Sequence, residues 1–139
     1  MTRINVIPPD ELTDQHLIAE YREIFMVGSS LVRSMRSPHW EKNKLKIPTT
    51  FTLNKGHVSF FYNKGLYLEN RYNELIYEMK LRGMNPDPNR AFKRFQWPPE
   101  LYNDWAPTLQ AMQIVRARIA FRISQKPNWY RKTKVKITT

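Results

Sequence analysis

Three segments in which apolar residues recur every three or four positions limit most strongly the folds open to this chain. They cover residues 13–36, 64–82 and 108–125. This spacing is typical of amphipathic helices that each bury one face. With three helices and loop-rich connections, the expected fold is a compact all-α domain, and a two-layer α/β fold is the alternative.

Each predicted helix has a start or stop signal. Thr13 or Asp14 can cap the first helix, Gly83 is placed to end the second, and Thr108 caps the third. The first helix is expected to bury Leu17, Tyr21, Phe25, Gly28 and Val32, and the third to bury Leu109, Met112, Val115, Ile119 and Ile123. Glu23 then points away from the core, and His16, Glu20 and Val27 flank the same line.

The connections between these helices are long. Residues 37–63 are expected to be loop-like, and the short apolar run 58–62 within them fits a strand or a buried loop. Residues 84–107 hold five prolines and are predicted to be irregular. Five aromatic side chains should order this second connection: Phe92, Phe95, Trp97, Tyr102 and Trp105. Residues 1–139 are therefore expected to form a single domain with long ordered loops.

Several classes of protein are excluded by what the chain lacks. It has no cysteine, so disulfides, zinc fingers, iron–sulfur clusters and thiol nucleophiles are ruled out. No apolar run approaches the roughly 18 residues of a membrane span, and no signal-peptide pattern is present, so a soluble, cytoplasmic chain is expected. The three histidines show no ligand spacing, and neither a metal nor a cofactor is expected.

The charge of the chain is unevenly distributed. The formal net charge is +11, and the last 35 residues contribute +8 of it because no acidic residue follows Asp104. In the tail, Trp129 and Tyr130 adjoin Arg131 and Lys132, and cations interleaved with aromatic rings suit a polymer of phosphates and stacking bases. The alternative is a solvated, solubilising face.

On the third predicted helix, Arg118 and Arg122 are four residues apart. Side chains at this spacing project from one face and can straddle neighbouring phosphates. Together with the basic tail, this pair makes nucleic acid the leading candidate partner.

The start of the chain offers a nucleophile. Once Met1 is removed, the α-amine of Thr2 is free, and an α-amine has a pKa much closer to neutrality than a lysine, so more of it is unprotonated. Arg3 and Arg22 should lower that pKa further, since like charges disfavour the ammonium form. Glu23 is the candidate acidic partner. A magnesium nuclease built on Glu78 and Lys80, and an amino-terminal hydrolase using the Thr2 hydroxyl, are alternatives.

Several stretches of the sequence resemble one family of repair enzymes. They are Thr2-Arg3-Ile4-Asn5, Asp14-Gln15-His16-Leu17, Ala19-Glu20-Tyr21-Arg22-Glu23, Gly56-His57-Val58, Phe60-Phe61-Tyr62, Glu74-Leu75-Ile76, Arg82-Gly83, Ala117-Arg118 and Trp129-Tyr130. These stretches are similar to the pyrimidine-dimer DNA glycosylases with abasic-site lyase activity, which act in the repair of ultraviolet damage. The resemblance covers nearly the whole chain and is poor over residues 84–110.

The resemblance implies a function and a set of site residues. Thr2 would supply the nucleophilic amine and Glu23 the acidic catalyst, forming an imine and cleaving the strand by β-elimination. The substrate would be double-stranded DNA with damaged bases or abasic sites, in a bacterial or phage-infected cell, and the enzyme a monomer. A non-catalytic basic DNA-binding module is the alternative. The DNA-contacting residues would be Arg3, Gln15, His16, Arg22, Arg118, Arg122, Trp129, Tyr130, Arg131 and Lys132.

One departure from the pattern matters. The phage enzyme of this family has an arginine three residues after its catalytic glutamate, where this chain has Met26. Arg33 and Arg36 are the candidates to replace that phosphate contact.

Overall fold

The computed structural model of the chain describes residues 3–135. In this part of the chain every regular element is helical, so the all-α prediction is confirmed and the α/β alternative is wrong. The α-helices are more numerous than expected: α1 (Asp14–Glu23), α2 (Phe25–Met35), α3 (Trp40–Asn43), α4 (His57–Phe60), α5 (Gly65–Leu81) and α6 (Leu109–Gln125). Short 3₁₀ turns cover Pro9–Glu11, Lys44–Lys46, Phe61–Asn63, Arg94–Gln96 and Pro99–Leu101.

The first predicted helix is in fact two helices that meet at Ile24. Thr13 caps α1 as expected, its hydroxyl accepting from the N–H of His16, but α1 ends at Glu23. At that end, the guanidinium of Arg90 donates to the carbonyl oxygens of Tyr21 and Arg22. Carbonyls in the last turn of a helix need such partners. Arg90 follows Tyr21 by 69 residues, so the periodicity of residues 13–36 could not reveal the break.

Two side chains expected to flank Glu23 on the solvent side are buried instead. Glu20 is 1 % exposed and Val27 is fully buried. The carboxylate of Glu20 pairs with Arg71 of α5 at 2.6 Å, and α5 packs across α1. A helix covered on two sides buries more than one stripe, which explains why the one-sided reading was wrong.

The second predicted helix is confirmed as α5. Gly83 ends it at a φ of 81°, a left-handed conformation that glycine adopts without strain. The N–H of Gly83 donates to Lys80 and the N–H of Met84 donates to Met79, the paired bonds of a Schellman motif.

The apolar run 58–62 forms neither a strand nor an irregular loop. It is helical, in α4 and the 3₁₀ turn after it, and Gly56 at a φ of 95° turns the chain into α4. Phe60 and Phe61 are buried there against Phe51 and Trp105. Short apolar runs look alike in buried strands and buried helical turns, so periodicity could not separate them.

The proline-rich connection is irregular and packed, largely as predicted. Trp97 is buried against α5, where a Cβ on Gly65 would lie 2.8 Å from the indole. Phe92, Tyr102 and Trp105 are partly buried against the core. Phe95 is wrong as a packing residue, because it is 85 % exposed.

Helix α6 begins and ends where the sequence predicts. The Thr108 hydroxyl accepts from the N–H of Ala111. Val115 and Ile119 are buried and Met112 and Ile123 are partly buried, as expected. Leu109 is wrong as a core residue: it is 72 % exposed, and Ala111 takes the buried place in that first turn.

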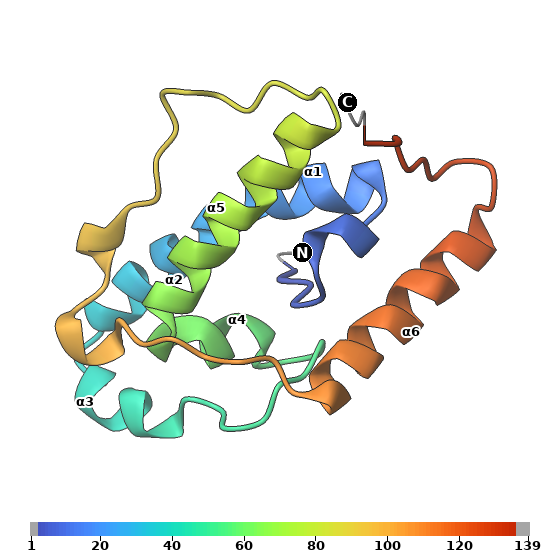
Figure 1. The fold of residues 1–139 in the computed structure, drawn as a ribbon. Coiled ribbons are helices and arrows are strands. Elements are labelled where there is room, and N and C mark those ends of the chain that lie inside the picture. The colour runs from blue at the N-terminus through green and yellow to red at the C-terminus, as the bar shows by residue number, and fades with distance from the viewer. Residues whose placement is uncertain (1–2, 136–139) are drawn as a thin grey trace.

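Figure 1 shows how these elements are arranged around the N-terminal segment. Helix α5 crosses α1 and α2, and α6 runs on the other side of the N-terminal segment. After α6 the chain turns back and residues 131–133 bond to the start of α1. The first described residues, from Arg3 on, therefore lie between α1 and α6.

Candidate active site

A pocket of about 400 Å³ lies between α1, α6 and the first described residues. Six residues singled out from the sequence line it: Arg3, His16, Glu23, Arg118, Arg122 and Tyr130. These residues come from four separate parts of the chain. The pocket therefore unites an acidic group, three guanidinium groups and two aromatic rings.

Glu23 occupies the last position of α1. Its side chain is neither fully buried nor fully exposed, so it can meet both the pocket and a bound molecule. The bend at Ile24 follows directly, and Arg90 holds the carbonyls of the two preceding residues. The guanidinium of Arg90 lies 4.3 Å from the ring centre of Tyr21 and 4.0 Å from that of Phe25. This cluster fixes the end of α1 from which Glu23 projects.

Three arginines give the pocket its positive charge. Arg118 and Arg122 enter from one face of α6, and neither pairs with a carboxylate within 4.0 Å among residues 3–135. Burial lowers the pKa of Arg3, and the charges of Arg118 and Arg122 lower it further, while Glu23 opposes them. Unpaired guanidinium groups held close together are suited to bind phosphate oxygens.

His16 and Tyr130 form an aromatic wall of the pocket. Their ring centres are 4.8 Å apart and their planes differ by 4°. The Nδ1 atom of His16 lies 2.6 Å from the Thr13 hydroxyl. Burial lowers the pKa of His16, and the charge of Arg122 adds to this effect. The lowered pKa favours the neutral form of His16.

The tail is tied to the start of α1, which brings Tyr130 to His16. The Gln15 side-chain amide donates to the carbonyl of Trp129 at 2.6 Å and accepts from the N–H of Arg131 at 2.9 Å. The Asp14 carboxylate accepts from the N–H and the hydroxyl of Thr133. Gln15, a predicted DNA contact, lies outside the pocket lining and holds the tail, and its contact with DNA stays a prediction.

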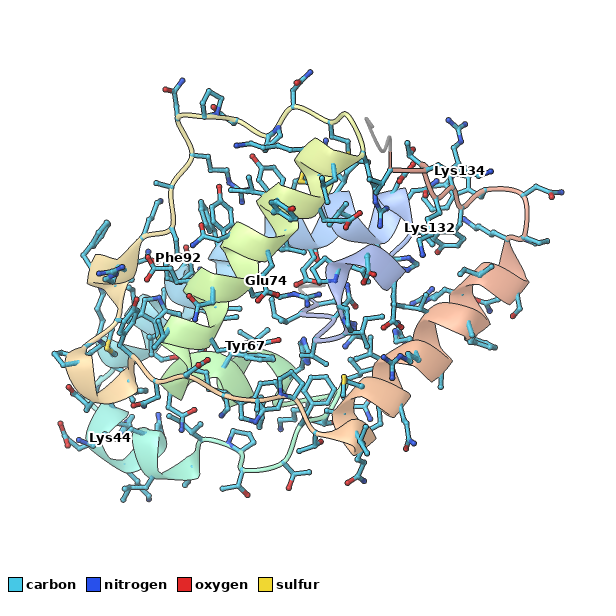
Figure 2. The ribbon with its side chains drawn as sticks, viewed as in Figure 1. Lys44, Tyr67, Glu74, Phe92, Lys132 and Lys134 are labelled. Carbon is cyan, nitrogen blue, oxygen red and sulfur yellow. The ribbon has the colours of Figure 1, made fainter. Side chains whose placement is uncertain are left out.

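The other predicted residues lie around the pocket rather than in it. Arg22, Trp129, Arg131 and Lys132 are exposed and absent from the lining. Figure 2 shows Lys132 with Lys134 on the tail, while Lys44 lies on the opposite side of the molecule. The exposed cations of the tail thus adjoin the pocket. Thr2 lies outside the described residues.

Met26 occupies the position at which the resemblance leads one to expect an arginine. Met26 is 54 % exposed in the first turn of α2. Arg33 and Arg36, the candidates to replace that arginine, are exposed near the end of α2 and do not line the pocket.

Four residues of the pocket lining were not predicted: Asn5, Ala19, Glu20 and Ile119. For Glu20 a signal was present, because it lies one helical turn before Glu23. Its partner Arg71 carries no such signal, since it is 51 residues away. Arg90, which holds the end of α1, lies where the sequence resemblance is poor.

A metal site is not apparent in the described part of the chain. Among residues 3–135, no group of three or more His, Asp or Glu side chains could hold a metal ion. Glu78, the basis of the magnesium-nuclease alternative, bonds to Arg82 at 2.8 Å. No helix between residues 3 and 135 is long and apolar enough to cross a membrane.

About two thirds of the chain match one known protein family. A family model for pyrimidine dimer DNA glycosylases matches residues 1–92, which is more than half of the chain. The match includes α1 with Glu23, the N-terminal segment and α5. The chain belongs to the pyrimidine dimer DNA glycosylase family, and is thus a DNA repair glycosylase.

Proposed function

We propose that this glycosylase excises ultraviolet-induced pyrimidine dimers and then cleaves the strand as an abasic-site lyase. The free amine of Thr2 is the nucleophile and Glu23 is the acid–base catalyst. The observation that carries the proposal is the shared pocket of Glu23 and Arg3, because Arg3 directly follows Thr2 in the sequence. The amine becomes available only after removal of Met1.

The first step replaces the damaged base with the amine. The nitrogen of Thr2 forms a bond to C1′ of the sugar while the glycosidic bond breaks, and the base leaves with the bonding electrons. Glu23 stabilises the positive charge that develops on the sugar. The nitrogen then gives one proton to the departed base and a second to the ring oxygen as the sugar ring opens, which leaves an imine between C1′ and the enzyme.

The second step breaks the strand. The Glu23 carboxylate takes the proton from C2′, the released electron pair forms a double bond between C2′ and C3′, and the 3′ phosphate leaves. Water then hydrolyses the imine and frees the amine. No step in this sequence requires a metal or a cofactor.

The basic residues bind the duplex in this proposal. Arg3, Arg118 and Arg122 contact phosphates beside the lesion, and the exposed cations of the tail extend the contact. Bringing the sugar to the amine requires a distorted duplex with an extruded nucleotide, and a lesion that has weakened stacking lowers that cost. His16 and Tyr130 offer stacked rings at the pocket wall.

The decisive experiment traps the imine. A duplex with one pyrimidine dimer is incubated with the enzyme and borohydride in the presence of a metal chelator, and the protein–DNA adduct is mapped by mass spectrometry. We expect a stable adduct at residue 2, and no adduct on an undamaged duplex of the same sequence. Salt-sensitive binding without an adduct would instead support the non-catalytic DNA-binding module.

One lysine must be checked in the same map. Burial lowers the pKa of Lys64 to about 8, so its amine is a rival nucleophile. In the structure its Nζ donates to the carbonyl of Phe60 and to Asn63, each at 2.8 Å, which occupies the amine. An adduct at Lys64 would refute the assignment to Thr2.

A further inference from the structure

The first described residues make a strained reversal. Val6 has a φ of 40°, which is unusual for a β-branched side chain, and it is 3 % exposed. The N–H of Ile7 donates to the carbonyl of Asn5 across Val6. Such a conformation persists only where surrounding contacts enforce it, and it often marks a functional segment. Here the surrounding contacts can be named.

A buried ion pair holds both ends of this turn. The Oε1 atom of Glu20 accepts from the N–H of Asn5 at 3.0 Å, and Arg71 donates to the carbonyl of Ile7 at 2.5 Å. Glu20 and Arg71 are joined to each other by bonds of 2.6 and 3.0 Å. Burial opposes the charge of Arg71, but the Glu20 carboxylate outweighs it, so the pKa of Arg71 is raised.

A buried histidine holds the residue before this turn. The Nε2 atom of His57 accepts from the N–H of Ile4 at 2.9 Å, and Nδ1 donates to the carbonyl of Thr52 at 2.8 Å. The second bond fixes the tautomer that leaves Nε2 free to accept. His57 is 3 % exposed, and its ring packs edge to face against those of Phe51 and Phe61. Burial lowers the pKa of His57, which favours the neutral form that this geometry requires.

These contacts bind backbone groups of Ile4, Asn5 and Ile7 from three different helices. His57 belongs to α4, Glu20 to α1 and Arg71 to α5, and the Arg3 guanidinium adds a bond to the carbonyl of Leu53. None of His57, Glu20 or Arg71 is needed as a chemical group in the proposed reaction. The bonds of these three buried polar side chains to the backbone of residues 4–7 therefore need another explanation.

We propose that His57 and the Glu20–Arg71 pair are positioning residues that hold residues 4–7 so that the α-amine of Thr2 meets the pocket lined by Glu23. This inference rests on the proposed function. A nucleophile on a free chain end would sample many orientations, and a displacement of about 1 Å can cost on the order of 100-fold in rate. The bonds to the N–H groups of Ile4 and Asn5 remove that freedom. The side chains that make these bonds need not contact DNA.

The test distinguishes a positioning role of His57 from a role in folding. It compares a variant that lacks the hydrogen-bond acceptor at Nε2 with one that restores an acceptor. His57→Leu removes the acceptor and keeps apolar bulk, whereas the amide oxygen of His57→Gln can accept from Ile4 again. The measurement is the single-turnover rate of borohydride trapping on a duplex with a preformed abasic site. We expect His57→Leu to trap at least about 10-fold more slowly at an unchanged DNA dissociation constant, and His57→Gln to recover most of the rate. The matched control is His39→Leu, because His39 is an exposed histidine.

The outcomes distinguish this inference from the proposed function. If the wild-type enzyme gives no adduct at residue 2, the proposed function fails. If the wild type is trapped there and His57→Leu, folded to the same extent, is trapped equally fast, the positioning role fails. It also fails if His57→Gln is as slow as His57→Leu. Should His57→Leu not fold, hydrogen exchange on the wild type decides: the amides of Ile4 and Asn5 should exchange as slowly as that of buried Leu75, and exchange at the rate of a frayed end would refute the grip.

Discussion

Glu23 is the side chain on which the proposed chemistry depends, and a change of one atom tests it. In Glu23→Gln the side chain keeps its size but can no longer take up a proton. We expect base release and strand cleavage to fall by at least about 100-fold, the usual contribution of a general acid–base group. Binding to damaged DNA should persist, because a negative charge is removed from a pocket lined by three arginines.

The measurement is cleavage of a dimer-containing duplex, with the dissociation constant from a gel-shift titration beside it. Glu100→Gln is the control, since Glu100 is exposed and absent from the pocket lining. Retention of cleavage by Glu23→Gln would remove Glu23 from the mechanism.

Arg118 and Arg116 offer a matched pair on α6. Arg118 lines the pocket, whereas the guanidinium of Arg116 bonds to the carboxylate of Glu11 at 2.8 Å. We expect Arg118→Ala to weaken DNA binding and to make the slope of log affinity against log salt shallower by about one. Arg116→Ala should change that slope little, because its charge is already paired. Equal changes in the two slopes, measured by salt titration, would contradict a phosphate contact at Arg118.

At this scale the sequence pointed to charged residues of the pocket lining but not to the partners of buried charges. Glu23 was singled out through the family resemblance, and Arg118 and Arg122 by their spacing; all three line the pocket, and their roles stay predictions. Glu20 was placed on the solvent side because its partner Arg71 lies 51 residues away on another helix. Helical periodicity assigns a side to a residue but cannot identify a buried charge that a distant chain segment neutralises.

Among the elements, the contact between α5 and the proline-rich connection depends on a missing side chain. Gly65 is the first residue of α5, and a Cβ there would lie 2.8 to 3.0 Å from three atoms of the Trp97 indole. Gly65→Ala should therefore force the buried ring to move and lower the free energy of unfolding by about 1–3 kcal/mol. Urea denaturation measures the change.

The control for this substitution is Asn73→Ala on the exposed side of α5, which should change stability by less than about 0.5 kcal/mol. If Gly65→Ala were as stable as the wild type, the packing of Trp97 against the start of α5 would be wrong.

The ends of elements were predicted more accurately than their breaks. Thr13, Gly83 and Thr108 act through bonds to residues a few positions away, so the signal lies within the local sequence. The break at Ile24 depends on Arg90, which comes from the distant connection. The helical form of residues 58–60 depends on burial against Phe51 and Trp105, which only the folded chain supplies.

Over the whole molecule, many acidic residues form ion pairs that support the fold, whereas unpaired basic residues are available to bind DNA. Six carboxylates form ion pairs among the described residues: Glu11, Asp14, Glu20, Glu41, Glu69 and Glu78. Several of these pairs join distant segments, as Asp14 and Arg82 do between α1 and the end of α5. Among the described residues, Arg118 and Arg122 of the pocket and the exposed cations of the tail form no ion pair, which leaves their charge available where DNA would bind.

The histidines and carboxylates whose pKa values are shifted by the fold predict how the stability of the protein depends on pH. His16 and His57 are held neutral, because burial lowers the pKa of each below the ordinary value of about 6.5. Below pH 6.5 the unfolded chain therefore binds protons that the folded chain does not, and stability falls as the pH falls. The carboxylates of Glu11, Asp14 and Glu69 have lowered pKa values, so their contribution is present above their ordinary range and is lost only in more acidic solution.

We therefore expect the midpoint of urea denaturation to fall between pH 6.5 and 5, before the carboxylates titrate. His57→Gln removes one of the two histidines that gain a proton on unfolding, so its stability should decline less steeply over that interval. His39→Gln is the control substitution at an exposed histidine. If the decline in His57→Gln matched that of the wild type, His57 would have to accept its proton within the fold, and the neutral acceptor that holds Ile4 would be excluded.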